Sequence, residues 1–429
     1  MLDITFIREN LEIVRTALKN KNREGIDLER LLSLADERKA VASLISEINR
    51  KRNEAQEARD AEAGKRLKEE LKAAEEKYQE LEKEILPLLL KIPNIPSADT
   101  PVGADESANQ TLAEWGEKRT FSFNPKPHWE IGEALGIIDN EKAAEVSGAR
   151  FTYLLGDLAL MQFALIDLAM KTLTSRESIA RIASESGIQT DSKPFIPVIP
   201  PIMMKPNIMN RMARLDPIEE RYVFEKDDIV LVGSAEHTLG PLHMDETIME
   251  ARLPIRYVGY STSFRREAGA AGKDTRGILR LHQFDKVEME TFCLPENSYA
   301  EQDLLVAIQS DLLKQLNIPH RMIICSTGDQ GDADHRHVDV ESWMPGQSTY
   351  RETHSADLMQ GYQARRLNTK VKRANGDTEP VHMNDATVFA IGRTLIAILE
   401  NYQEEDGSVT VPEALRSYLG KEKIEKVSI

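Results

Sequence analysis

The chain has 429 residues, of which 41% are hydrophobic and 29% are charged, so it is long enough for two or more domains with a substantial buried core. The formal net charge of −16 argues against a protein that binds nucleic acid over its whole surface, although a local basic stripe stays open. The two cysteines, Cys293 and Cys325, are far apart, which gives no support to a disulfide framework or a zinc ribbon and favours a reducing compartment.

The N-terminus and the apolar content predict a cytoplasmic protein without a membrane segment. Residues 1–20 mix Asp3, Arg8 and Glu12 with apolar residues, which is unlike a signal peptide. No apolar run approaches the length of a membrane span.

Residues 27–90 predict a pair of long helices. This stretch is rich in Glu, Lys, Arg, Ala and Leu, and the polar residues 59–64 mark a reversal point near its middle. In the second half, apolar residues repeat at alternating spacings of four and three, as in a heptad seam. The seam residues are Leu67, Leu71, Ala74, Tyr78, Leu81, Ile85 and Leu88, and Val41, Ile45 and Ile48 begin a matching seam upstream.

We therefore expect an antiparallel helical hairpin with arms of about 30 residues, each on the order of 45 Å long. A dimerisation coiled coil is the alternative, but the internal turn favours pairing within one chain. Prolines mark the end of the arm and a linker, namely Pro87, Pro93, Pro96 and Pro101. We place the domain boundary after residue 105, between a helical arm (1–105) and a second domain (106–429).

After the linker the pattern changes to mixed helices and strands. A long buried helix is predicted at 144–174, a strand broken by prolines at 195–203, and an amphipathic helix at 301–316. Further strands are predicted at 228–232, 256–264, 278–292 and 388–391, the last leading into a helix through Tyr402. Antiparallel strands with helices on one side predict an α+β domain. The chain has no G-x-x-x-x-G-K-[ST] and no strand-linked G-x-G-x-x-G, which excludes a P-loop and a Rossmann site.

The most informative segment is the predicted strand–loop–strand at residues 263–292. Because side chains alternate along a strand, Arg265 and Glu267 are expected on one face of the first strand. A glycine-rich loop, A-G-A-A-G-K-D-T-R-G at 268–277, separates the two strands. Six side chains should share one face of the second strand, namely Arg280, His282, Phe284, Lys286, Glu288 and Glu290. This surface suits a nucleotide beside a small amino-bearing molecule, whereas the plain alternative is a solvated hairpin of mixed charge.

These residues resemble the second signature motif of class II aminoacyl-tRNA synthetases, in the seryl-tRNA synthetase version, and the resemblance runs through the whole chain. It implies a class II catalytic domain on an antiparallel sheet that uses ATP and Mg²⁺. It further implies that Arg265 holds the α-phosphate of ATP, that Glu267 accepts from the adenine amino group and that Phe284 stacks on the ring. The implied ATP-binding residues are Arg265, Arg266, Glu267, Arg280, Phe284, Glu352, Thr353, His354, Ser355 and Arg393.

Two further segments carry the resemblance. G-R-T-L-I-A-I-L-E-N-Y-Q at 392–403 is similar to the third class II motif, which implies Arg393 as a second catalytic arginine beside Arg265, on the γ-phosphate at a helix start. Y-R-E-T-H-S-A-D-L-M-Q-G-Y-Q-A-R-R at 350–366 is similar to the metal and ATP segment of the family. It implies Glu352 and Ser355 as Mg²⁺ ligands, since this ion prefers hard oxygen donors.

The resemblance also implies an amino-acid site and a dimer interface. G-S-A-E at 233–236 stands where the family usually has Thr-Ala-Glu, and Asp385-Ala386-Thr387 matches its Asn-Gly-Ser or Asn-Ala-Thr element. The implied serine-binding residues are Ser234, Ala235, Glu236, Glu288 and Thr387. I-P-P at 199–201 is similar to the first class II motif, which in this class forms a homodimer interface.

The implied reaction activates L-serine with ATP to seryl-adenylate and then transfers the seryl group to serine tRNA. The helical arm would contact the long variable arm of that tRNA through its basic residues. These are Arg38, Lys39, Arg50, Lys51, Arg52, Arg59, Lys65, Arg66 and Lys68. The alternative for such a mixture of charges is a solvated helical surface.

Five positions depart from the usual family pattern, namely Ser234, Thr353, His354, Leu358 and Asp385. Because they cluster near the implied ATP, metal and serine groups, a second hypothesis is a synthetase-like protein without catalysis that binds tRNA or acts as a scaffold. A related alternative is an enzyme that charges a carrier protein, which the presence of the arm disfavours.

Overall fold

The computed structural model describes residues 1–267 and 276–426, and the chain divides into two compact units, Met1–Ile95 and Pro96–Ile429. The division falls within the predicted proline-rich linker, earlier than the boundary placed after residue 105.

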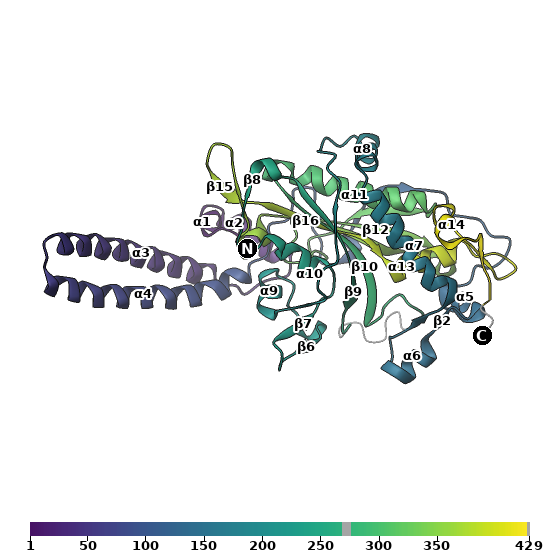
Figure 1. Ribbon diagram of the computed structural model, residues 1–429, viewed down its shortest axis with the longest axis horizontal. Coiled ribbons are helices and arrows are strands. Elements are labelled where there is room, and N and C mark those ends of the chain that lie inside the picture. The colour runs from purple at the N-terminus through teal and green to yellow at the C-terminus, as the bar shows by residue number, and fades with distance from the viewer. Residues whose placement is uncertain (268–275, 427–429) are drawn as a thin grey trace. The chain divides into compact units, whose positions relative to one another are not determined.

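The first unit consists of two short helices followed by a long helical hairpin. α1 (Ile4–Glu9) and α2 (Leu11–Asn20) precede α3 (Leu28–Glu57) and α4 (Ala61–Leu90), which run side by side in opposite directions (Figure 1). α3 and α4 each have 30 residues, which confirms the predicted arms. The carboxylates of the preceding aspartates, Asp27 and Asp60, cap them by accepting from free backbone N–H groups in the first turn.

An apolar seam joins α3 to α4 within one chain. Its buried residues are Ile48, Leu67, Leu71 and Ala74, with Val41, Ile45 and Ala55 packed against them. The second arm ends at Leu90 as predicted, and Pro87, the first of the four prolines that mark its end, lies inside the last turn of α4. Proline removes one helical hydrogen bond, but burial of Ile85 and Leu89 on either side holds this last turn in place.

The second unit is built on an eight-stranded sheet with the order β1-β11-β12-β13-β16-β10-β9-β4. Its neighbouring strands are antiparallel except β4 and β9, which are parallel. The predicted α+β class is confirmed. The strands are β1 (Gln110–Trp115), β4 (Ile196–Val198), β9 (Ile255–Phe264), β10 (Gln283–Cys293), β11 (His320–Ile324), β12 (Arg336–Met344), β13 (Thr349–Gln360) and β16 (His382–Ala390).

Three helices cover one face of this sheet and form the core with it, namely α7 (Gly156–Leu173), α11 (Ser298–Gln315) and α13 (Ile391–Asn401). Val287 and Met289 of β10 point into this core. The alternate residues Glu288 and Glu290 therefore point to the opposite face, where polar side chains gather.

Smaller elements complete the second unit. The helices are α5 (His128–Leu135), α6 (Asn140–Ser147), α8 (Arg176–Glu185), α9 (Pro206–Arg211), α10 (Glu236–Leu239), α12 (Tyr362–Leu367) and α14 (Glu413–Leu419). The strands of the small sheets are β2 (Ile138–Asp139), β3 (Tyr153–Leu154), β5 (Met203–Met204), β6 (Val223–Phe224), β7 (Ile229–Leu231), β8 (Thr247–Met249), β14 (Lys370–Lys372), β15 (Thr378–Pro380), β17 (Val409–Thr410) and β18 (Lys423–Ile424).

The prediction of one helix over 144–174 is wrong. The segment contains the end of α6, the strand β3 and then α7. Gly148 and Gly156 have φ angles of +104° and +54°, which break the helical path on both sides of β3. Among the described residues, no single helix is both long and apolar enough to cross a membrane; α7 and α8 meet that criterion only as a pair bent by 79°.

Candidate functional site

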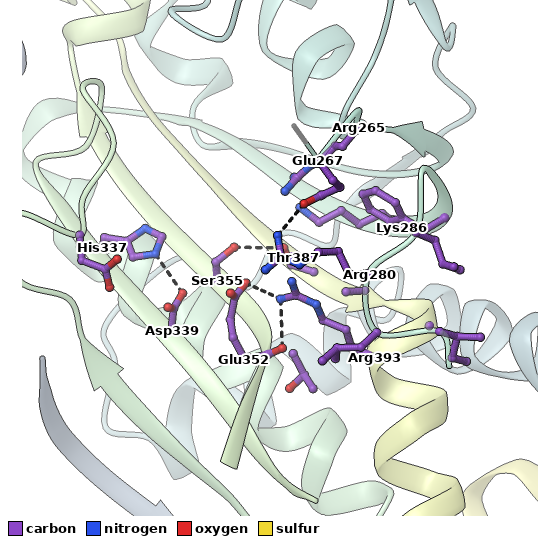
Figure 2. A pocket seen from close by; sticks show the side chains of 18 residues that line it. Arg265, Glu267, Arg280, Lys286, His337, Asp339, Glu352, Ser355, Thr387 and Arg393 are labelled. Carbon is purple, nitrogen blue, oxygen red and sulfur yellow. Dashed lines mark hydrogen bonds and ion pairs between the residues drawn. The ribbon is translucent and has the colours of Figure 1, made fainter. Parts of the chain in front are cut away.

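Four of the predicted site residues meet at the end of the β9–β10 pair. Arg265, Glu267, Arg280 and Phe284 line a pocket of about 310 Å³ (Figure 2). The Arg280 guanidinium donates to Glu267 at 2.5 Å, and the guanidinium carbon of Arg265 lies 5.5 Å from the centre of the Phe284 ring. Positively charged side chains and an aromatic ring thus line one cavity.

The prediction that this grouping arises from regular strands is wrong for the residues nearest the loop. β9 ends at Phe264 and β10 begins at Gln283, so Arg265, Glu267, Arg280 and His282 lie outside the strands. Glu267 has a φ angle of +53°, in the left-handed region, and does not continue the extended chain. His282 does not line the pocket, since its ring packs beside Phe151 and Tyr222.

His128, a buried residue, contacts the chain at Gly277 and Ile278, where the glycine-rich segment ends. Residues 268–275 of that segment lie outside the described part of the chain. Gly277 has a φ angle of +71°, and a Cβ atom there would lie 2.0 Å from Nε2 of His128. The same Nε2 accepts from the backbone N–H of Ile278 at 3.1 Å, while Nδ1 lies 3.1 Å from Glu400 of α13. This contact ties the pocket wall that begins at Ile278 to α13.

Within β10 the predicted alternation is confirmed. Phe284 and Lys286 line the pocket, and Glu288 and Glu290 follow on the same face. The register sets Gly259 of β9 opposite Glu288. A Cβ atom at Gly259 would lie 2.9 Å from Leu239, so glycine lets α10 approach the sheet here.

A β-bulge places Glu352 and Ser355 on the same face of β13. Glu352 pairs with Glu341 and His354 with Val340, so Thr353 is an extra residue with no partner in β12. In a regular strand, residues three apart point to opposite faces. The bulge reverses this parity, and both side chains line the pocket.

Arg393 enters the pocket from the first turn of α13 and pairs with Glu352. Its guanidinium lies 2.9 Å from the Glu352 carboxylate and also donates to the Glu352 carbonyl at 3.1 Å (Figure 2). Burial raises the pKa of Glu352, but Arg393, His337 and Arg265 together outweigh burial and the net pKa lies below the usual value. The pair therefore stays ionised.

The predicted serine-binding residues form a buried cluster next to the pocket. The Ser234 hydroxyl donates to Oε1 of Glu288 at 2.7 Å, and Lys286 and Thr387 meet the same oxygen. Among the described residues, Oε2 of Glu288 is buried without a hydrogen-bond partner. Burial raises the pKa of Glu288. Ala235 is buried at the start of α10.

Glu236 belongs to a charged network around Arg214 that links four carboxylates. The Arg214 guanidinium lies 2.5 Å from Glu236, 3.2 Å from Asp357, 3.6 Å from Asp385 and 3.8 Å from Asp334. Burial and then the charge of Glu236 raise the pKa of Asp385 well above its usual value. The single guanidinium thus offsets repulsion among acids that lie close together.

The departures at 353, 354 and 358 lie largely outside the pocket. Thr353 lines it, but its hydroxyl donates to the Val340 carbonyl at 3.2 Å. His354 does not line the pocket; its ring packs 5.7 Å from Phe389, and burial lowers its pKa to about 3. Leu358 is buried in β13 next to Asp357 and therefore points to the opposite face. An ATP-binding role for the His354 side chain does not fit this placement.

Arg266 also points elsewhere, because its guanidinium carbon lies 5.7 Å from the ring centre of Tyr222 and it does not line the pocket.

Several residues of the site were not predicted from the sequence. Asp329, His337 and Asp339 line the pocket, and Arg214 organises the acids beside it. His337 and Asp339 are two residues apart on β12 and therefore share one face, so strand periodicity could have grouped them. Arg214 follows the short helix α9 in a loop, where no periodic pattern marks it.

Comparison with known proteins gives a consistent result over the whole chain. The family description "Seryl-tRNA synthetase N-terminal domain" matches residues 1–96, and "tRNA synthetase class II core domain (G, H, P, S and T)" matches residues 222–402. A serine–tRNA ligase from Coprothermobacter proteolyticus is 38% identical over 98% of this chain and 100% of the relative.

Two solved structures are also similar. Seryl-tRNA synthetase from Pyrococcus horikoshii complexed with ATP is 34% identical, with a TM-score of 0.87 and full coverage of both chains. The cytoplasmic serine–tRNA ligase from Naegleria fowleri in complex with AMP is 29% identical, with a TM-score of 0.84 over 100% of this chain and 99% of that one.

Proposed function

The chain belongs to the seryl-tRNA synthetase family and is a serine–tRNA ligase, and we propose that its pocket binds ATP while the adjoining Glu288 cluster binds L-serine. The observation that carries this assignment is the meeting of Arg265, Arg393 and Phe284 in one cavity. Two guanidinium groups suit phosphates, and the aromatic plate suits a purine ring. The relatives of known structure that hold ATP or AMP support the nucleotide assignment.

Within this pocket we assign the adenine to Phe284 and Glu267, the α-phosphate to Arg265 and the γ-phosphate to Arg393. Glu267 is held by Arg280, which orients its carboxylate. Arg393 lies in the first turn of α13, where the positive end of the helix dipole adds to its charge.

Glu352 and Ser355 fit Mg²⁺, because a carboxylate and a hydroxyl on the same pocket wall are hard oxygen donors. A bound Mg²⁺ would supply positive charge to the phosphates of ATP. Glu352 also holds Arg393 by the ion pair at 2.9 Å, which positions that guanidinium in the pocket.

For serine, we assign the ammonium group to Ser234 and Glu236 and the hydroxyl to Glu288 and Thr387. The buried Oε2 of Glu288 is an acceptor without a partner among the described residues, which supports a ligand donor at this place. Arg214 is then a positioning residue, since it holds Glu236 at 2.5 Å.

Two chemical steps follow from these positions. An oxygen of the serine carboxylate attacks the α-phosphorus of ATP, the bond to the bridging oxygen breaks, and pyrophosphate leaves. A ribose hydroxyl of the tRNA then attacks the seryl carbonyl, and AMP leaves. Arg265 and Arg393 neutralise charge on the phosphates, and the residues otherwise act by positioning.

The helical arm and the dimer complete the proposal. We assign serine tRNA to the basic residues of α3 and α4, because Arg50, Lys51 and Arg52 are exposed or half-buried on one turn of α3. We assign a homodimer interface to the 199–201 segment, because Ile199 is an apolar residue that is 91% exposed. A cytoplasmic location is part of this proposal, since ATP and tRNA are available there.

Serine-dependent exchange of labelled pyrophosphate into ATP tests the assignment directly. We expect exchange with the wild type and a loss of about 10- to 100-fold for Arg265→Lys, because lysine keeps the charge but loses the planar fork. Arg266→Lys is the matched control, since the adjacent guanidinium faces Tyr222 and its replacement should leave exchange unchanged.

Absence of exchange in the wild type at saturating serine and Mg²⁺ would favour the non-catalytic tRNA-binding or scaffolding alternative. The comparisons give that alternative no support, since the relatives are serine–tRNA ligases over their full length.

A further inference from the structure

Three different metal-ligating side chains meet at the β11–β12 edge of the pocket. Cys325 follows β11, and His337 and Asp339 lie two residues apart on β12, so they share one face. The backbone N–H of Cys325 donates to the His337 carbonyl at 3.0 Å, which brings the two strands into register at this point. The candidate ligand atoms of Cys325, His337 and Asp339 all lie within 4.8 Å of one another.

The Asp339 carboxylate contacts both of the other side chains, one through each of its oxygens. Nε2 of His337 lies 2.9 Å from Oδ1 of Asp339, and Sγ of Cys325 lies 3.4 Å from Oδ2 of the same carboxylate (Figure 2 shows the first pair). In a tetrahedral site with metal–ligand distances of about 2.0–2.3 Å, ligand atoms are separated by roughly 3.3–3.7 Å. The Sγ–Oδ2 separation lies in this range and the Nε2–Oδ1 separation is shorter, so a rotation of the Asp339 carboxylate that brings one oxygen between the two neighbours would complete the site.

A second carboxylate orients the imidazole from the other side. Nδ1 of His337 contacts Asp357, which in turn accepts from Arg214 at 3.2 Å. A ligating histidine usually gives its second ring N–H to a carboxylate, because this fixes the tautomer and makes the other nitrogen a better ligand. Asp357 therefore leaves Nε2 for the centre shared with Cys325 and Asp339.

We propose that Cys325, His337 and Asp339 bind a divalent transition-metal ion, with Zn²⁺ the best match to one sulfur, one nitrogen and one oxygen donor. His337 and Asp339 line the nucleotide pocket while Cys325 is buried behind them, so the fourth coordination position faces the pocket. A second group, Asp334, His337 and Asp357, shares the same histidine. Its two carboxylates already pair with Arg214, which makes it the weaker candidate.

This site differs in chemistry from the proposed Mg²⁺ ligands Glu352 and Ser355, which offer oxygen atoms only. A bound divalent ion would offset the charge of Asp339 and would fix the β11–β12 wall of the pocket.

Titration of the chelator-treated full-length protein with Co²⁺, a spectroscopic substitute for Zn²⁺, tests the proposal without an activity measurement. We expect one equivalent to produce a near-ultraviolet thiolate-to-cobalt charge-transfer band, which Zn²⁺ should then displace. Cys325→Ser and His337→Gln should each abolish the band. Cys293→Ser should keep it, because Cys293 is a buried thiol on β10 outside either metal-ligating group found among the described residues.

Three results would overturn the proposal. One is wild-type protein that takes up Co²⁺ with no charge-transfer band. Another is a band that disappears with Cys293→Ser but persists with Cys325→Ser. The third is Co²⁺ binding that Glu352→Gln abolishes while His337→Gln leaves it intact. Circular dichroism of each metal-free variant separates loss of the site from loss of the fold.

Discussion

In the proposed serine site, Glu288 is the side chain that would distinguish an amino acid with a hydroxyl group from one without. Its Oε1 meets Ser234, Lys286 and Thr387, whereas its Oε2 is buried without a partner among the described residues. A ligand that fills this space without a hydrogen-bond donor leaves the acceptor unpaired, at a cost of about 1–3 kcal/mol. Serine can satisfy the oxygen and alanine cannot.

Removal of the Thr387 hydroxyl should weaken serine selection. Thr387→Val keeps the shape but deletes one contact to Glu288, so we expect the KM for serine to rise about tenfold in pyrophosphate exchange. Thr291→Val is the matched control, because Thr291 is an equally buried threonine whose hydroxyl bonds to the Asn384 carbonyl. An equal rise in both variants would show a general packing effect.

His354 should make the stability of the second unit depend on pH. Burial holds the folded-state pKa near 3, below the unfolded value of about 6.5, so the unfolded state binds the proton first as the pH falls. The stability contribution of a neutral His354 is therefore complete above pH 6.5 and is lost progressively toward pH 3. By pH 5 the loss is about 2 kcal/mol.

Urea unfolding of wild type and His354→Gln at pH 7 and pH 5 measures this loss. The difference in unfolding free energy between the two proteins should shrink by about 2 kcal/mol at pH 5. Tryptophan fluorescence is a suitable signal, because Trp115, Trp129 and Trp343 all lie in the second unit. A difference that does not change with pH would show that His354 is not buried in its neutral form.

At the scale of elements, the bulge in β13 decides which side chains reach the pocket. Thr353 is the extra residue, and if it were paired as in a regular strand, Glu352 and Ser355 would point to opposite faces. β16 carries a similar irregularity opposite Val287 and Glu288, next to Thr387. The pocket therefore depends on strands that are not regular.

Insertion of one alanine after Thr353 should abolish pyrophosphate exchange, by at least about 100-fold, because it shifts the strand by one residue and only one of Glu352 and Ser355 can then face the pocket. Thr353→Ser keeps the bulge and the hydroxyl, and it should retain exchange within about threefold. Circular dichroism and thermal melting should show both variants folded. Substantial exchange by a folded insertion variant would mean that the bulge does not set the positions of these side chains.

These elements also show what the sequence could and could not predict. Strand periodicity correctly predicted that Phe284, Lys286 and Glu288 share one face, because that part of β10 is regular. The helical hairpin followed from its heptad seam. The positions of Glu267 and Arg280 depend instead on a left-handed residue and on anchoring by His128, and no local pattern encodes either contact. The roles of Glu352 and Ser355 came only from family resemblance, since alternation alone would separate them.

At the scale of the whole molecule, the proposed adenylate site and the proposed tRNA surface lie in different units. The first unit has its own apolar seam, and all pocket residues lie in the second unit. Replacement of residues 28–90 by a short Gly-Ser linker should leave pyrophosphate exchange within about twofold. It should lower charging of serine tRNA about 100-fold or more, because the phosphate contacts of the arm are lost.

A charge variant tests the arm without removing it. Arg50, Lys51 and Arg52 replaced by alanine should raise the KM for tRNA and reduce its salt dependence. Lys72→Ala combined with Lys77→Ala is the control, because it removes positive charge from α4 at positions outside the basic residues assigned to tRNA. If both variants lower charging equally, net charge rather than a defined tRNA surface is responsible. If the linker variant loses exchange as well, the arm is needed for folding of the second unit.

The network around Arg214 has a consequence for the ancestry of this chain. Asp357 and Asp385 come from neighbouring strands, and both depend on a guanidinium that belongs to neither. An aspartate acquired at 385 before that cation existed would have met Glu236 and Asp357 without compensation. Relatives with an aspartate at 385 are therefore expected to have a basic residue at 214. The two positions should covary among relatives, although 214 lies outside every signature motif.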